Sequence, residues 1–410
     1  MEYGLIGEHL SHSFSKAIHE EIAGYKYELK EIAKCDLAAF MMSKNFKAIN
    51  VTIPYKEAVI PYLDEISEEV KMVGAVNTVV NRNGKLIGYN TDMPGFMALV
   101  RHMNYDVKGK NVLVLGNGGA SKAVVAALKK LGANKIIKAS IEGEKDCITY
   151  DEIYDLKDIP LVVNTTPIGM YPNNDGSLID LSKIKGAEAF IDVIYNPIRT
   201  KTVLSALDLG LKAEGGLYML VAQALYAIEI FLNKSLDKKL IDKVYRDVLR
   251  KKSNIVLIGM PTCGKSTIGK KIANKFGLDF VDTDQEITKI IKMKIKDYFA
   301  LFGEEPFRNL ETEVVMKYFL STPKVISTGG GIIKRKINMD LLKQNGFVYF
   351  IKRDLDLLKP SHKRPLSSNV NDLKKLYEER LPIYEKYADE IIDNNDDDFN
   401  YATKRLVKML

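Results

Sequence analysis

Two stretches of the 410-residue chain share the order of buried strand, glycine-rich turn and helix, and this order restricts the possible folds more than any other feature. In the first stretch, the apolar residues 111–115 precede a turn at residues 116–120 and a helix. In the second, the apolar residues 254–258 precede a turn at residues 259–264 and a helix that ends near Gly277. Strands that alternate with helices in this way are typical of parallel sheets covered by helices. The sequence therefore predicts an α/β fold.

The length and composition indicate a globular protein of two or three domains. Apolar residues make up 46% of the chain and charged residues 28%, which is ordinary for a soluble protein. No segment approaches the ~18 uninterrupted apolar residues of a membrane span, and the N-terminus does not look like a signal peptide. Cys35, Cys147 and Cys263 are too few and too far apart for a disulfide framework, so we expect a cytoplasmic protein.

The net charge of +7 is spread along the chain and not collected in a basic tail. Such an excess suits an enzyme whose ligands carry phosphates and carboxylates. Because no basic motif with interleaved aromatic residues is present, we expect no nucleic acid partner.

Two local patterns divide the chain further. Residues 79–80 and 86–87 are apolar and flank Asn83-Gly84, which predicts a β-hairpin. A long helical pattern starts at Tyr218 and ends in the polar residues 250–253, where we place a domain boundary. The acidic run at residues 393–398 is interpreted as a solvated loop before the last helix.

Residues 259–266 (GMPTCGKS) match the phosphate-binding pattern GxxxxGK[ST] between a strand and a helix. Backbone N–H groups and the helix N-terminus bind phosphate oxygens in such a loop. Lys265 would neutralise charge between the β- and γ-phosphates of ATP, and Ser266 would ligate Mg²⁺. A tight turn with a chance lysine is the alternative, which the strand and helix context disfavours. The nucleotide-binding residues predicted here are Gly259, Gly264, Lys265, Ser266 and Thr267.

Residues beyond this loop indicate what accepts the phosphoryl group. Asp282 and Asp284 stand at i and i+2 after an apolar strand, so their carboxylates are expected to point the same way. One would hold Mg²⁺ through water and the other would accept a proton, although a helix cap is an equal alternative for this pair. Arginines that grip carboxylates and a bare glycine backbone complete a cradle for a small acid. These residues are Arg308 in an FRxxE pattern, Gly330 in a glycine triplet, Arg364 in a polar stretch suited to a lid, and Arg380.

This ordered set resembles shikimate kinase over residues 254–410. The resemblance implies four shikimate-binding residues, namely Asp284, Arg308, Gly330 and Arg380. It also implies that Asp284 accepts the proton of the 3-hydroxyl, that Asp282 helps to place Mg²⁺, and that Arg364 closes on the transferring phosphoryl group. Many members of this family carry glycine where Thr262 stands, and the lid is short here.

Polar groups within the first 92 residues suit a polyhydroxylated ligand, because serines, threonines and asparagines can pair with its hydroxyls. Those groups are Ser13, Ser15, Thr52 and Asn77. Lys56 follows a strand that stops at Pro54, and Asp92 closes the pattern GYNTD. A lone lysine usually faces solvent, but beside a carboxylate it can move a proton.

The turn after residues 111–115 has the pattern of a dinucleotide-binding turn, formed by Gly116, Gly118, Gly119, Ala120 and Ser121. The third glycine of the usual pattern is replaced by Ser121, which weakens the motif. The strand before the turn and the helix after it support the interpretation.

Residues 1–250 resemble shikimate dehydrogenase, and three further motifs carry the likeness, at residues 164–170, 192–197 and 216–223. The resemblance implies substrate contacts from Ser13, Ser15, Thr52, Asn77, Asp92, Tyr195 and Gln223. It implies that Lys56 and Asp92 form the acid/base pair. A helix cap is the alternative for Ser13 and Ser15, and core packing is the alternative for Tyr195.

The cofactor preference rests on the residues after the next strand. Ser140 stands where the family usually has an arginine that holds the 2′-phosphate of NADP. Glu142 and Glu144 would repel that phosphate, whereas Lys138 or Lys145 is a substitute for the arginine. NADP is the expectation from the family, with NAD as the alternative.

Together these patterns predict a bifunctional enzyme that reduces 3-dehydroshikimate to shikimate and then phosphorylates shikimate to shikimate 3-phosphate. Residues 1–92, completed by helices over 216–250, would form a substrate lobe, and residues 93–215 a Rossmann-like NAD(P)-binding lobe. Residues 254–410 would form a P-loop kinase domain with a parallel sheet. We make no prediction of the oligomeric state.

Two alternatives remain at this point. The same domains would suit a ligand-sensing regulator without turnover if Lys56, Asp92, Lys265 or Asp284 were missing, but all four are present. The first domain would alternatively oxidise quinate, although the attached kinase favours shikimate.

Overall fold

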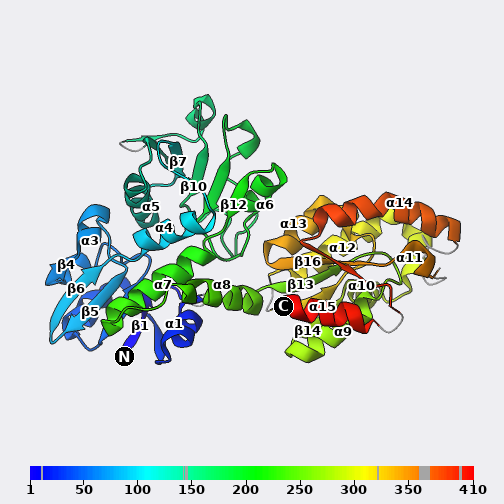
Figure 1. Cartoon of the computed structure of the whole chain (residues 1–410), viewed down its shortest axis with the longest axis horizontal. Coiled ribbons are helices and arrows are strands. Elements are labelled where there is room, and N and C mark those ends of the chain that lie inside the picture. The colour runs from blue at the N-terminus through cyan, green and yellow to red at the C-terminus, as the bar shows by residue number, and fades with distance from the viewer. Residues whose placement is uncertain (11–12, 142, 144–145, 321–322, 360–369, 397–398) are drawn as a thin grey trace. The chain divides into compact units, whose positions relative to one another are not determined.

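Three β-sheets organise the part of the chain that the structure describes, which is residues 1–410 without 11–12, 142, 144–145, 321–322, 360–369 and 397–398. The structure is a computed structural model, and it divides into residues 1–249 and residues 250–410 (Figure 1). The first unit holds two of the sheets and the second unit holds one. The predicted α/β class is confirmed.

The first sheet has the order β2-β1-β3-β5-β6-β4. Its strands are β1 (Tyr3–Gly7), β2 (Tyr27–Glu31), β3 (Ala48–Val51), β4 (Glu65–Ile66), β5 (Thr78–Arg82) and β6 (Lys85–Tyr89). Its helices are α1 (Ser15–Ala23), α2 (Leu37–Ser43) and α3 (Glu68–Val73). The predicted hairpin is confirmed as antiparallel β5 and β6, with Asn83 and Gly84 both at positive φ, as a tight two-residue turn requires.

The second sheet is parallel throughout, with the order β12-β11-β10-β7-β8-β9. Its strands are β7 (Asn111–Leu115), β8 (Lys135–Ala139), β9 (Cys147–Ile148), β10 (Leu161–Asn164), β11 (Ala189–Asp192) and β12 (Lys212–Glu214). Its helices are α4 (Asp92–His102), α5 (Gly119–Lys130) and α6 (Lys201–Asp208). Four of the five residues of β7 are buried, which explains why its sequence is an apolar run without alternation.

Two helices follow, α7 (Leu217–Leu232) and α8 (Lys239–Lys252). The sequence predicted helices over 216–250, and the chain turns between them at Asn233, whose φ of +50° ends α7 in a left-handed cap. α7 packs against α1, α4 and β5, so it contacts elements of both sheets of the unit. An apolar sequence with eleven buried residues fits this sandwiched position.

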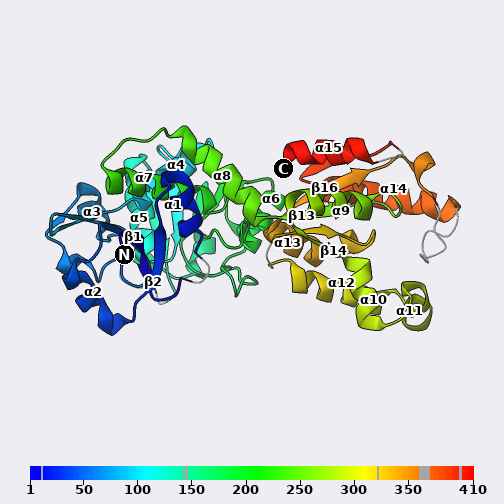
Figure 2. The ribbon, with the colours of Figure 1, turned by 90° about the horizontal axis from the view of Figure 1, so that it is seen from below.

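The second unit is built on a parallel sheet of order β14-β15-β13-β16-β17. Its strands are β13 (Asn254–Ile258), β14 (Asp279–Asp282), β15 (Lys324–Ser327), β16 (Gly346–Lys352) and β17 (Glu390–Asp393). Its helices are α9 (Lys265–Phe276), α10 (Thr283–Ile291), α11 (Ile295–Phe302), α12 (Glu304–Tyr318), α13 (Lys336–Gln344), α14 (Val370–Tyr387) and α15 (Asn400–Met409). Figure 2 shows α10 and α11 beyond the sheet, where they pack with α12 around a small apolar cluster of their own.

Two local expectations are corrected in this unit, those for Asp284 and for the acidic run at residues 393–398. Asp284 lies in the first turn of α10 and not on a strand, because Asp282 ends β14 and caps the helix. Arg380 lies in the interior of α14, which begins ten residues earlier at Val370. Asn394, in the acidic run that we interpreted as solvated, is fully buried.

Among the described residues, no helix has the length and apolar character needed to cross a membrane. The three cysteines carry free thiols, with Cys35 exposed and Cys263 buried.

Candidate active sites

Lys56 and Asp92 form an ion pair in the first unit, with 2.7 Å between Nζ and Oδ2. Lys56 follows the end of β3, and Asp92 opens α4, where a carboxylate is favoured by the helix dipole. The two side chains are only 18% and 11% exposed. The pair is therefore shielded from solvent but still reachable by a ligand, as an acid/base pair must be.

Lys56 also lies beside the glycine-rich turn that follows β7. A Cβ built on Gly119 would stand 4.0 Å from Cδ of Lys56, so the lysine stem passes directly over the start of α5. The neighbouring residue Glu57 pairs with Lys122 of α5 at 2.7 Å. A reducing group bound at this turn would consequently lie next to the ammonium of Lys56.

Asn77 is held in one orientation by its neighbours. Its Oδ1 accepts a hydrogen bond of 2.8 Å from the backbone N–H of Thr91, which leaves its Nδ2 directed at Thr91 Oγ1 and, at 3.5 Å, at Gln223 Oε1. Gln223 comes from α7, and its Nε2 donates to the carbonyl of Leu220. Amides and hydroxyls from three separate elements thus converge beside Asp92.

Asn50 and Tyr27 hold the backbone of Asn77 in place. The hydroxyl of Tyr27 donates to Asn50 Oδ1 at 2.7 Å, and Asn50 Nδ2 donates to the carbonyl of Asn77 at 3.1 Å. Our sequence analysis did not assign a role to Thr91 or Asn50. The available signal was position alone: Thr91 directly precedes Asp92, and Asn50 is the next-to-last residue of β3, the strand that leads to Lys56.

The serines of the first helix show the local bonding expected of a helix start. Ser13 Oγ accepts a hydrogen bond from the backbone N–H of Ser15, and Ser15 is buried. Tyr195 packs its ring against Phe14, with 5.2 Å between the centroids, and burial raises the pKa of its phenol. Thr52 follows β3, and its methyl group fills the space that a side chain at Gly7 would take.

The glycine turn after β7 leaves room for a ligand on the backbone. Gly116 has a φ of +101°, and a Cβ there would meet Thr165 and Thr166, so only glycine fits. Gly118 caps α5 without a side-chain hydrogen bond, and Gly119 and Ala120 begin the helix. The first N–H groups of α5 therefore face the turn, as anion binding at a helix N-terminus requires.

Ser121, which replaces the third glycine, is buried, and its hydroxyl has no hydrogen-bond partner among the described residues. Ser140 follows β8, and its N–H donates to the carbonyl of Ile148. Lys138 donates from Nζ to Asn117 Oδ1 at 3.0 Å, which places its ammonium at the glycine turn. Glu142, Glu144 and Lys145 lie outside the described residues.

Asp192 is the buried centre of a network at the ends of β10 and β11. Its Oδ1 accepts from Asn164 Nδ2 and from the N–H of Ile194, both at 3.0 Å, and its Oδ2 accepts from Thr200 Oγ1 at 2.7 Å. Asn164 in turn accepts from the N–H and the hydroxyl of Thr166. Burial raises the pKa of Asp192 to about 7, against the opposing effect of these hydrogen bonds.

In the second unit, the turn of residues 259–264 wraps around the ammonium of Lys265. The Nζ donates to the carbonyls of Gly259 and Met260 at 2.8 and 2.9 Å. Gly264 has a φ of +99° and caps α9, whose first residues are Lys265, Ser266 and Thr267. The predicted phosphate-binding residues are therefore adjacent to one helix N-terminus.

Ser266 and Asp282 meet at the base of this turn, with 2.7 Å between Oγ and Oδ2. Asp282 Oδ1 accepts from the N–H groups of Asp284 and Gln285, so the carboxylate also caps α10. The helix-cap alternative considered for this residue is therefore confirmed. Two oxygen ligands so close together fit a hard cation such as Mg²⁺.

The glycine triplet after β15 is enclosed by charged side chains. A Cβ built on Gly329 would lie 2.4 Å from an oxygen of Asp284, one on Gly330 would lie 3.3 Å from Nη1 of Arg380, and one on Gly331 would lie 2.1 Å from Nη1 of Arg308. The absence of side chains lets Asp284, Arg308 and Arg380 converge here. A small acid between them would meet a carboxylate at one end and two guanidinium groups at the other.

The two arginines of this cluster are held differently. Arg308 is anchored by Glu304 at 2.7 Å and by Glu311 at 2.6 Å. Arg380 is 3% exposed, and its Nε has no hydrogen-bond partner among the described residues. A buried guanidinium with an unsatisfied N–H is suited to receive a carboxylate. Arg364, predicted for the same site, lies outside the described residues.

Glu311 was part of the FRxxE pattern, but the sequence did not indicate its role. Its side chain is 1% exposed, and burial raises its pKa to about 7. Arg308 opposes this rise and the nearby Asp284 adds to it. The ion pair of 2.6 Å requires the ionised form, so we take Glu311 as an anion that holds Arg308 in place.

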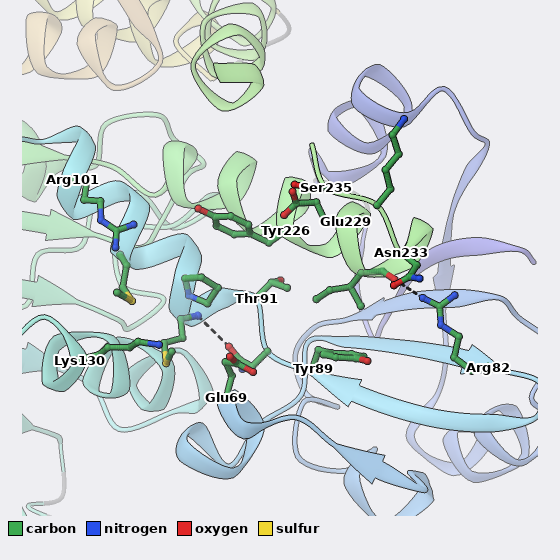
Figure 3. A pocket seen from close by; sticks show the side chains of 16 residues that line it. Glu69, Arg82, Tyr89, Thr91, Arg101, Lys130, Tyr226, Glu229, Asn233 and Ser235 are labelled. Carbon is green, nitrogen blue, oxygen red and sulfur yellow. Dashed lines mark hydrogen bonds between the residues drawn. The ribbon is translucent and has the colours of Figure 1, made fainter. Parts of the chain in front are cut away.

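A separate cavity of about 800 Å³ borders the first site. Figure 3 shows its walls, which include Thr91 and the residues Arg101, Lys130 and Tyr226. Lys56, Asp92, Asn77 and Gln223 do not line it. The cavity therefore backs onto the site without containing its reactive groups.

These features define the class of the protein: a two-lobed dinucleotide-binding oxidoreductase joined to a P-loop phosphotransferase. The family models agree, since residues 5–79 match the shikimate dehydrogenase substrate binding domain and residues 261–410 match shikimate kinase. The chain belongs to the shikimate dehydrogenase family and carries a shikimate kinase domain behind it.

Individual relatives match the first unit along almost their whole length. An NADP(+) shikimate dehydrogenase of Clostridium beijerinckii is 41% identical over 59% of this chain and 96% of the relative. Shikimate dehydrogenase 1 from Peptoclostridium difficile is 38% identical in sequence. Its crystal structure matches with a TM-score of 0.57 over 60% of this chain and 98% of its own. The Thermus thermophilus enzyme, solved with NADP(H) and shikimate, is 28% identical, with a TM-score of 0.55 over 60% of this chain and 99% of its own.

Asp192 generates a prediction about stability. Its folded pKa lies above the ordinary value of 3.8, so the stability that it contributes is complete at low pH and is lost as the pH rises through about 7. We expect this loss to reach up to about 4 kcal/mol for the first unit. The Asp192→Asn variant can donate to Thr200 and should not show this pH dependence.

Hydrogen exchange followed by mass spectrometry on the full chain checks this, because peptides from β10 and β11 report the first unit separately. Peptides from the second unit serve as the internal control. Equal pH dependence in Asp192→Asn and the unaltered chain would contradict the assignment.

Proposed function

We propose that this chain reduces 3-dehydroshikimate to shikimate with a nicotinamide cofactor in residues 1–250 and phosphorylates shikimate with ATP in residues 254–410. Residues 1–92 with helices over 216–250 serve as the substrate lobe, and residues 93–215 as the NAD(P)-binding lobe. The observation that carries the proposal is the presence in one chain of the Lys56–Asp92 pair beside a dinucleotide turn and of Asp284 at a glycine triplet that adjoins the phosphate loop.

In the reduction, the bound nicotinamide supplies a hydride to the ketone carbon. Lys56 donates a proton to the carbonyl oxygen, and Asp92 stabilises the ammonium form of Lys56 from 2.7 Å. Asn77, whose Nδ2 is already directed by Thr91, and Gln223 pair with the ring hydroxyls. Ser13, Ser15, Thr52 and Tyr195 complete the substrate contacts.

NADP is the proposed cofactor. The similar enzyme of Clostridium beijerinckii is named for NADP(+), and the Thermus thermophilus structure contains NADP(H). Lys138 is the described cation at the glycine turn, since its Nζ lies 3.0 Å from Asn117 Oδ1. Because the family's arginine is replaced by Ser140, we propose that Lys138 supplies the positive charge. Free thiols at all three cysteines fit a cytoplasmic enzyme.

In the phosphorylation, residues 259–267 hold the phosphates of ATP, and the ammonium of Lys265 exchanges its loop carbonyls for phosphate oxygens. Ser266 and Asp282 would hold Mg²⁺, which neutralises phosphate charge. Asp284 accepts the proton of the 3-hydroxyl. Arg308 and Arg380 bind the carboxylate of shikimate, and Arg364 is proposed to meet the transferring phosphoryl group.

The two sites should be separable by mutation. Lys56→Ala should lower the kcat of reduction by at least ~100-fold and leave phosphorylation unchanged, because only the first site loses its proton donor. Asp284→Asn should do the reverse. The assay supplies the purified chain with 3-dehydroshikimate, NADPH or NADH, and ATP, and analyses the products.

Lys71→Ala, which changes an exposed lysine of α3, is the matched control and should leave both activities unchanged. If both site variants kept both activities, the catalytic assignments would be wrong. Supplying quinate and NAD in a parallel reaction tests the alternative substrate of the first site.

Gly331→Ala tests the carboxylate end of the second site. The added methyl group would overlap the guanidinium of Arg308, which cannot move freely because Glu304 and Glu311 hold it. We expect the KM for shikimate in phosphorylation to rise at least ~10-fold, as the loss of one charged hydrogen bond implies. Steady-state kinetics give the value, and an unchanged KM would show that Arg308 does not bind the substrate. An unchanged KM for ATP in the same variant would show that its second unit is folded.

A further inference from the structure

The phosphate loop contains a threonine in a backbone conformation that threonine rarely adopts. Thr262 has a φ of +65°, in the left-handed region. Branching at Cβ makes this region unfavourable, so a residue such as glycine would occupy it with less strain. Strain of this kind persists where another interaction compensates for it.

The compensating interaction is formed by the hydroxyl of Thr262. Its Oγ1 donates to the carbonyl of Lys359 at 3.1 Å and accepts from the N–H of Lys359 at 3.2 Å. One side chain thus pairs with both backbone groups of a residue that lies 97 positions away. Glycine at position 262 would relieve the strain but leave these two groups without that partner.

The next two residues of the loop, Cys263 and Gly264, are contacted by Asn394, which directly follows β17. Asn394 is fully buried and donates from Nδ2 to the carbonyl of Cys263 at 2.7 Å. It also lies against Gly264, since a Cβ there would meet Asn394 Nδ2 at 2.8 Å. The loop is therefore fixed from outside at three consecutive positions.

Arg353 connects the two segments that do this. Its Nη1 donates to the carbonyl of Asn394 at 2.7 Å, and its Nε donates to the carbonyl of Leu357 at 3.2 Å. The guanidinium lies over the ring of Phe399, 5.4 Å from its centre, and Phe399 is packed against Gly264. Residues 353–359, Asn394 and Phe399 thus form one support for the phosphate loop, and the exposed Thr262 attaches the loop to it.

We propose that Thr262 is a positioning residue for ATP, whose hydroxyl fixes the phosphate loop on the backbone of Lys359. The N–H groups of the loop are then pre-arranged for the triphosphate, so that less ordering is needed when ATP binds. The effect concerns the nucleotide and not the acceptor, because Asp284, Arg308 and Arg380 converge on residues 329–331, whereas the hydroxyl of Thr262 is bonded to Lys359. The inference rests on the proposed kinase function.

Three substitutions separate the hydroxyl from the strain. Thr262→Ser keeps the hydroxyl, Thr262→Val keeps the branched shape and the strain without the hydroxyl, and Thr262→Gly removes both. We expect Thr262→Val and Thr262→Gly to raise the KM for ATP about 10-fold, which is the loss of two ordinary hydrogen bonds. The kcat and the KM for shikimate should stay within about twofold, and Thr262→Ser should match the unaltered chain.

Calorimetric titration of the full chain with a non-hydrolysable ATP analogue gives a readout that does not require turnover. The dissociation constant should follow the same order among the variants. Equal affinity in Thr262→Val and Thr262→Ser, or an equal rise in both KM values, would overturn the proposal in favour of a merely structural role. If the order held in binding but shikimate were not phosphorylated, the proposed acceptor would fail while the role of Thr262 stood.

Discussion

Both sites depend on one constraint of parallel sheets, which is that all strands end at the same edge. In the first unit, β7 ends at Leu115, directly before Gly116, β10 ends at Asn164 and β11 at Asp192, so the turn and the buried network share an edge. In the second unit, the ends of β13, β14 and β15 bring together the phosphate loop, Asp282 and the glycine triplet. Residues far apart in sequence become neighbours because the strand order places them so.

At these strand ends, glycine residues leave space in which charged side chains lie directly against the backbone. At Gly331 a Cβ would occupy the position of the Arg308 guanidinium, and at Gly329 it would overlap the carboxylate of Asp284. Here glycine is required less for its backbone freedom than for the space it leaves. At Gly119 a Cβ would displace no side chain, since it would lie 4.0 Å from Cδ of Lys56, but the lysine stem still passes over the backbone there. Both sites therefore bring a reactive charge directly onto bare backbone, where a ligand's ring or phosphate can lie next to it.

The sequence predicted the elements whose signal is local. Residues 111–115 and 254–258 are strands, the hairpin turns at Asn83-Gly84, and Gly277 caps α9. Long-range features were harder to predict. The position of Asp284 on α10 depends on Asp282 acting as a cap, and the burial of Asn394 depends on a carbonyl of the phosphate loop. The sequence does not distinguish a polar residue that is buried against a partner from one in a solvated loop, so such contacts can be seen only in the folded structure.

The two sites differ in how completely their charges are balanced within the protein. Lys56 already has its counterion at 2.7 Å, so its ammonium group is paired and oriented by the protein alone. Arg308 likewise has Glu311, a carboxylate that burial alone would tend to neutralise and that the guanidinium favours as an anion. Arg380 lacks a partner for its Nε among the described residues although it is buried. A carboxylate ligand would remove that imbalance and a neutral ring would not, so in the proposed function the desolvated Arg380 would favour an acid among polyhydroxylated rings of the same size.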